Sequence, residues 1–101
     1  MLTSKQRAQL RGLANDAETI LHVGKNGVTE TVIQQLEESL TVQEIVKGKV
    51  LENAPMSPRE VLDALCAACK GEPVQVIGSK FVIYRENKKI DKDKRIRLVK
   101  D

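Results

Sequence analysis

Residue types suited to holding an anion occur together in the run Gly24-Lys25-Asn26-Gly27. The run lies between a short apolar segment and a helix that Thr29 is placed to cap. Glycines let a phosphate approach backbone N–H groups closely, a helix start adds free donors, and Lys25 adds a full charge. We therefore predict a phosphate-binding loop here. A tight strand-to-helix turn with an exposed lysine is the alternative, because G-x-x-G spacing alone is common in chains of this length.

A C-x-x-C pair, Cys66 and Cys69, is compatible with zinc binding or with redox chemistry. Zinc needs four ligands, and the only histidine is His22, which lies in an apolar strand segment and is interpreted as a core or edge residue. Redox pairs lie at helix amino ends, whereas these cysteines fall in the last turns of an expected helix. We therefore interpret the cysteines as buried structural residues and expect no metal or other cofactor. A thiol enzyme is the alternative.

Catalytic and nucleotide-binding patterns are otherwise absent from the sequence. No pair of carboxylates is spaced for acid–base work, and neither G-x-x-x-x-G-K-[ST] nor G-x-G-x-x-G occurs. The only aromatic side chains are Phe81 and Tyr84, too few for a base-stacking platform. We therefore expect a binding protein that is not an enzyme, and any nucleic acid would be held through its phosphates.

Charge is distributed unevenly along the 101 residues, which are enough for one domain. The net charge is +3, and residues 85–101 hold eight basic against four acidic side chains. A basic carboxyl end suggests a polyanionic partner such as nucleic acid, and a solvated tail is the alternative. We expect one domain over residues 1–85 and a basic, flexible tail over 86–101. A short strand at 96–99 is a further expectation.

Three helix starts can be located from their caps. Thr3 with Gln6 forms a predicted capping box, Thr29 is the cap of the second helix, and Ser57 is followed by a proline and a glutamate at the positions that begin a third. Gly71 is placed to end that third helix. Each helix carries an apolar stripe, so each is expected to pack against a sheet.

Strands are predicted at 20–23, 44–51, 74–77 and 81–84 from short apolar runs and two-residue alternation. Gly78 and Ser79 fit a type II′ hairpin turn between the last two strands. The order α-β-α-β-α-β-β, with its βαβ segments, predicts a two-layer α/β fold around a four-stranded mixed sheet. With no apolar run long enough to cross a bilayer and no signal peptide, we expect a cytoplasmic protein without membrane contact.

The sequence resembles the YhbY family, the single-domain form of the CRM domain (chloroplast RNA splicing and ribosome maturation). The resemblance covers residues 3–85 and consists of four blocks in order. These blocks are Ser4-Lys5-Gln6-Arg7 with Leu10, Leu13 and Ala14; Val23-Gly24-Lys25-Asn26-Gly27-Val28-Thr29; Glu44-Ile45-Val46-Lys47; and Val74-Gln75-Val76-Ile77-Gly78 followed by Val82-Ile83-Tyr84-Arg85.

The resemblance implies a fold similar to the carboxy-terminal domain of bacterial translation initiation factor three. It also implies RNA binding and association with precursors of the large ribosomal subunit. The family's glycine-loop role carries to Gly24, Lys25, Asn26 and Gly27, and its basic strand position to Lys47. This chain departs from the family at Gly48, where relatives usually carry a β-branched residue, and glycine there is expected to weaken the strand.

Our sequence-based hypothesis is a ribosome-assembly factor that binds structured large-subunit rRNA, with a monomer favoured. The loop and surrounding basic side chains would contact RNA. A protein-interaction module that docks on the ribosome through a ribosomal protein is the alternative. The expected RNA-binding residues are Gly24, Lys25, Asn26, Gly27, Lys5, Arg7, Arg11, Lys47, Lys49, Lys80 and Arg85.

Overall fold

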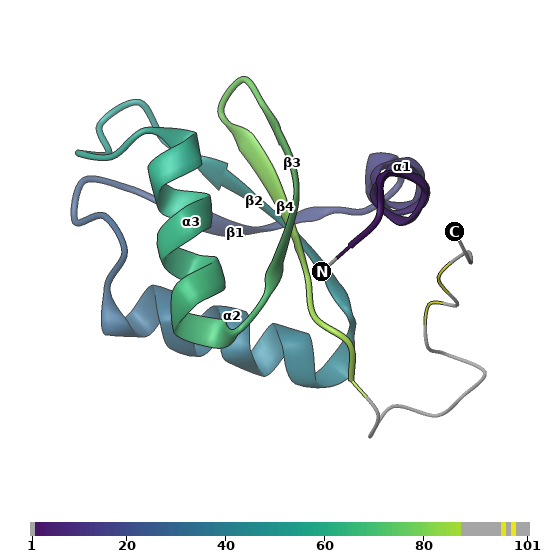
Figure 1. Ribbon diagram of the computed structural model, residues 1–101. Helices are drawn as coiled ribbons and strands as arrows, with labels where there is room; N and C mark the ends of the chain where they lie inside the picture. Colours follow the sequence, from purple (N-terminus) through teal and green to yellow (C-terminus); the bar gives the residue numbers. More distant parts are fainter. Residues whose placement is uncertain (1, 88–95, 97, 99–101) are drawn as a thin grey trace.

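Three helices and four strands make up the fold in the computed structural model, which describes residues 2–87, 96 and 98 (Figure 1). The predicted element order is confirmed. No helix among those residues is long and apolar enough to cross a membrane. The elements are α1 (Ser4–Asn15), β1 (Thr19–Val23), α2 (Glu30–Val42), β2 (Ile45–Val50), α3 (Pro58–Cys69), β3 (Glu72–Ile77) and β4 (Lys80–Tyr84).

The helices begin at the predicted caps. Thr3 and Ser57 each form a complete capping box, and the Thr29 hydroxyl accepts a hydrogen bond from the amide of Val32 at 3.2 Å. The end of α3 differs from the expectation. Lys70, and not Gly71, takes the left-handed conformation at the cap, with φ 57°.

The sheet has the order β1-β2-β4-β3, so β1 and β3 are its two edges. β1 runs parallel to β2, and the β2–β4 and β3–β4 pairs are antiparallel, which confirms the mixed sheet. Gly78, at φ 57°, begins the two-residue turn between β3 and β4, as a type II′ turn requires. The carboxyl ends of β1, β2 and β3 therefore lie at one end of the sheet.

Helices cover both faces of the sheet, where we expected two layers. α2 and α3 enclose the larger core on one face, around Leu36, Leu62 and Phe81. α1 lies on the other face, where Leu10 packs with Val82 in a second core (Figure 1). Consecutive apolar residues make β4 compatible with this arrangement, because a strand buried on both faces loses the usual polar alternation. α1 covers only part of its face.

Gly48 has a packing role in β2, and the expected weakening of the strand stays a prediction. Gly48 is paired directly with Phe81 of β4, and the phenyl ring lies over the glycine. A Cβ at this position would lie 2.7 Å from the ring Cε2 atom, closer than packing allows. The glycine thus makes room for the fully buried aromatic side chain of the core.

Glu44 is a buried carboxylate that ties down the chain beyond β4. Its Oε2 atom accepts a hydrogen bond from the amide of Asn87 at 2.8 Å, and its Oε1 atom accepts one from the amide of Ile96 at 2.6 Å. Ile96 and Leu98 pack against the α1-side core. Most of the predicted flexible tail, and part of the strand predicted at 96–99, lie outside the described residues.

Candidate functional site

The glycine loop forms a compact turn directly after β1. The amide of Gly27 donates to the carbonyl oxygen of Gly24 at 2.9 Å, which leaves Lys25 and Asn26 exposed at the tip. Gly27 itself is buried with φ 68°, and a Cβ there would meet the Pro55 ring at 3.3 Å. The second glycine is therefore required by local packing, while the tip is free to meet a ligand.

An open hollow of about 640 Å³ lies between this loop and the first turn of α2. Lys25 and Asn53 line it from two loops. First-turn amides of a helix lack intrahelical acceptors and favour anions. The carboxylate of Glu30 lies in the same first turn and opposes a phosphate there. The charge around the loop alone is therefore mixed, with Lys25 on one side and Glu30 on the other.

A row of basic side chains crosses the sheet at the same end as the loop. His22 of β1 is in register with Lys49 of β2, and Lys49 is directly opposite Lys80 of β4. Partners directly opposite one another project from the same face of a sheet. This face is the α1 side, because the neighbouring residues Leu21 and Val23 point into the α2–α3 core. The basic row lies beyond the part that α1 covers.

Lys47 lies two residues before Lys49 on the same face of β2, at the side nearer to α1. Its Nζ atom donates to the carbonyl oxygen of Ala14 at 3.3 Å, at the last turn of α1. An ammonium group has two further donors. Lys47 and Lys80 both line a small hollow on the sheet face, which Gln75 of β3 also lines. Lys47 thus fixes the end of α1 and remains available to a ligand.

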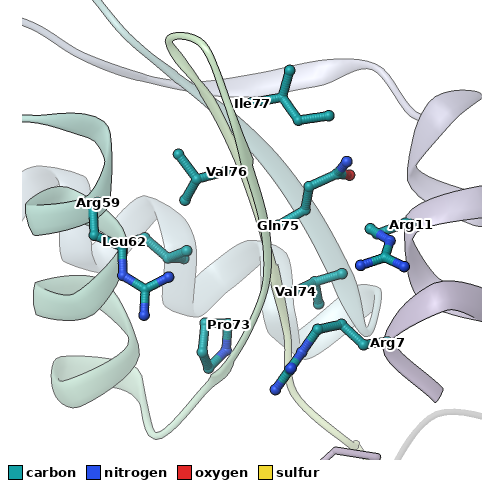
Figure 2. A pocket seen from close by; sticks show the side chains of 9 residues that line it. All are labelled: Arg7, Arg11, Arg59, Leu62, Pro73, Val74, Gln75, Val76 and Ile77. Carbon is teal, nitrogen blue, oxygen red and sulfur yellow. The ribbon is translucent and has the colours of Figure 1, made fainter. Parts of the chain in front are cut away.

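The basic residues of α1 face different ways. Arg7 and Arg11 turn toward β3 and line a groove along its outer edge (Figure 2). Lys5 is exposed, and it is about 200° around the helix axis from Arg7, on the side away from that groove. Lys5 therefore does not share a surface with the two arginines.

Arg85 lies at the other end of the sheet from the loop, directly after β4. Its Nη1 atom donates to the carboxylate of Glu37 at 2.8 Å and to the carbonyl oxygen of Cys69 at 3.1 Å. These bonds join the residue after β4 to the middle of α2 and to the last residue of α3. Arg85 is thus engaged in holding the fold and is separated from the loop by the length of the sheet.

A family model for the CRS1 / YhbY (CRM) domain matches residues 2–85, which is most of the chain. The chain belongs to the CRS1/YhbY family. This agrees with the resemblance inferred from its sequence blocks, and the four-stranded α/β fold is the fold of a solved relative. The hypothetical protein SAV1595 from Staphylococcus aureus has a solution structure that aligns with a TM-score of 0.81 and 41% identity, covering 98% of this chain and 100% of that one.

Curated relatives of this CRM domain are of similar length. The probable RNA-binding protein YqeI of Bacillus subtilis is 39% identical over 88 residues, spanning 87% of this chain and 92% of the relative. The probable RNA-binding protein PA4753 of Pseudomonas aeruginosa is 35% identical, spanning 91% of this chain and 88% of the relative. The match thus extends over nearly the whole of each relative.

The cysteines of this CRM domain lie near the carboxyl end of α3. Cys69 is buried and Cys66 half-buried in α3, and burial raises the pKa of the Cys66 thiol to about 12. Burial also raises the pKa of Cys69. A thiol with a raised pKa carries little nucleophilic thiolate at neutral pH. Within residues 2–87 and at 96 and 98, no three His, Cys, Asp or Glu side chains cluster to hold a metal.

Two residues of the CRM domain's basic surfaces were not predicted from the sequence as RNA-binding residues. His22 is exposed and in register with Lys49, and its alternation with Leu21 and Val23 was the available indication. Arg59 of α3 joins Arg7 and Arg11 around the edge of β3. No sequence pattern indicates that grouping, because the three arginines come from helices on opposite faces of the sheet.

Proposed function

We propose that this CRM protein binds structured RNA without catalysing a reaction, and that its target is large-subunit rRNA in an assembling ribosome. Curated relatives at 39% and 35% identity are each named a probable RNA-binding protein. The ribosomal target follows from the family resemblance. The net charge of +3 and the scarcity of aromatic residues favour recognition led by phosphate contacts.

The observation that carries this proposal is the row His22–Lys49–Lys80. Neighbouring strands are about 4.8 Å apart, so the row spans about 10 Å across three strands. An RNA backbone that crosses the strands would bring successive phosphates past these side chains. Phosphate charge would also relieve the repulsion between the opposed lysines, which costs stability in the free protein.

The glycine loop would extend this contact at the same end of the sheet. Lys25 and Asn26 project from the turn. The start of the loop is held next to the end of β2, because the carbonyl oxygen of Val23 accepts a hydrogen bond from the amide of Leu51. Lys47 adds a further cation, since it lines the same hollow as Lys80. We therefore assign the RNA surface to the glycine loop and to the row His22–Lys49–Lys80, which we call the lysine row. Lys5 and Arg85 lie outside this surface.

The test is a binding titration of the full chain with a labelled fragment of large-subunit rRNA. Lys25→Ala and Lys49→Gln should each weaken binding without lowering the thermal stability of the protein, because both side chains would contact phosphate and neither packs in the core. Lys5→Gln is the charge-matched control and should bind as the wild type does. Unchanged affinity for both surface variants would remove the assigned RNA surface.

Crosslinking in cells, followed by sequencing of the attached RNA, tests the ribosomal target. Large-subunit rRNA should dominate the crosslinked RNA. Retention on ribosomal particles after RNase removes accessible RNA would instead favour docking through a ribosomal protein.

A further inference from the structure

The outer edge of β3 forms the floor of a groove of about 450 Å³ between α1 and α3. Figure 2 shows Arg7 and Arg11 reaching toward β3 from α1, and Arg59 reaching toward it from α3 on the other side. Residues 73–77 of the strand run along the groove. Guanidinium groups therefore flank an open strand edge from both faces of the sheet.

The arginines of this groove are poorly neutralised. No acidic side chain lines it. Among the described residues, neither Arg7 nor Arg11 forms an ion pair, and the buried Nε atom of Arg7 has no hydrogen-bond partner. Arg59 pairs with Asp63 at 3.4 Å, but both side chains are more than half exposed, so water and salt screen that pair. The groove thus presents a net positive charge.

We propose that this arginine groove is a second RNA-backbone site, which receives the same RNA chain that crosses the lysine row. The inference rests on the proposed function. A guanidinium group binds phosphate through two parallel N–H donors, and arginine is favoured for that geometry. Backbone N–H groups on the free side of an edge strand add further donors.

The groove is continuous with the sheet-face hollow. Gln75 and Ile77 line the groove, and they also line the hollow that Lys47 and Lys80 line. Ile77 is also in register with Lys80, at the β3 end of the lysine row. A backbone leaving the row therefore passes directly to the β3 edge, and the ligand is a segment longer than the row alone can hold.

An extended acidic peptide is less well matched to the groove. A peptide that adds to a sheet needs a regular ladder of backbone hydrogen bonds. Pro73 lacks a donor, and the register of β3 shifts between Pro73 and Gln75. These two features interrupt the strand edge over residues 73–75, which is half of β3. Phosphate contacts from arginines need no such ladder.

The experiment measures the affinity and salt dependence of the full chain for two RNAs from one bound sequence, one spanning only the lysine row and one several nucleotides longer. Arg59→Gln and Arg7→Gln should each weaken binding of the longer RNA roughly tenfold. Each should also lower its salt slope by about 1. Neither should change binding of the short RNA. Lys5→Gln, which removes the same charge from α1, should change neither.

Wild-type affinity of both arginine variants for the longer RNA would overturn the groove site. If Lys49→Gln still weakened binding in that case, the proposed function would stand without the groove site. Nuclear magnetic resonance (NMR) titrations with poly-glutamate and with RNA distinguish the two occupants. Shifts of the Val76 and Ile77 amides with poly-glutamate alone would assign the groove to an acidic protein segment and overturn the RNA assignment.

Discussion

Lys49 and Lys80 lie directly opposite each other on β2 and β4, so two like charges share one position of the sheet. Like charges at this spacing destabilise an antiparallel pair. Neither lysine is buried, because Lys80 is exposed and Lys49 is half-buried. A bound anion that contacts both lysines would offset this repulsion.

Lys80→Gln should therefore stabilise the free protein and weaken RNA binding at the same time. The gain in the free energy of unfolding is expected to be about 0.2–1 kcal/mol, from relief of the repulsion with Lys49. Urea unfolding and an RNA titration measure the two effects. A solvated pair with no ligand would leave RNA affinity unchanged. Lys5→Gln, away from the row, should alter neither quantity.

Gly48→Ala should destabilise the fold by roughly 1–3 kcal/mol, because the new methyl group overlaps the Phe81 ring. Gly12→Ala is the matched control in exposed helix α1, where nothing lies within 4 Å of the added atom. That change should stabilise the protein by about 0.5–1 kcal/mol. Denaturant unfolding measures both. Equal stability of Gly48→Ala and the wild type would contradict the packing of Phe81 over Gly48.

Glu44→Gln should lower stability by about 1–3 kcal/mol, because an amide NH₂ replaces one acceptor and faces the backbone N–H of Asn87 or Ile96. Glu52→Gln, on the surface, is the control and should unfold like the wild type. Hydrogen exchange at Asn87 and Ile96 adds a local measurement. Unchanged protection of both amides in the variant would show that Glu44 does not hold this segment.

Stability should fall in alkaline solution between about pH 9 and pH 12. Burial raises the pKa of Cys66 from 9.0 to about 12 and that of Tyr84 from 10.0 to about 12. The unfolded chain therefore loses these protons first, so the stabilisation is complete below the unfolded pKa values and is lost as the pH rises through the folded ones. Denaturant unfolding across this range measures the loss, and Cys66→Ala should reduce it. A flat profile would contradict the burial of both groups.

Local features of the fold can be predicted from the sequence because they depend on neighbours along the chain. The caps at Thr3, Thr29 and Ser57 and the turn at Gly78 need only residues within three positions. The face that α1 covers cannot be predicted this way, because an apolar stripe shows that a helix packs without showing where.

In the candidate site, too, some features can be predicted from the sequence and others depend on tertiary contacts. The loop tip at Lys25 follows from sequence, and so does the alternation that projects Lys49 away from the core. The role of Arg85 does not, because its partner Glu37 is 48 residues away. The grouping of Arg59 with Arg7 depends on two helices meeting one strand from opposite faces. Only tertiary structure brings those arginines together.

The most direct test of the RNA surface is an NMR titration of the full chain with a large-subunit rRNA fragment, following backbone amides. We predict shifts or broadening at Gly24, Asn26, Lys49 and Lys80, with the amides of Glu37 and Arg85 unperturbed. Changes confined to the end of the sheet that holds Glu37 and Arg85 would contradict this prediction.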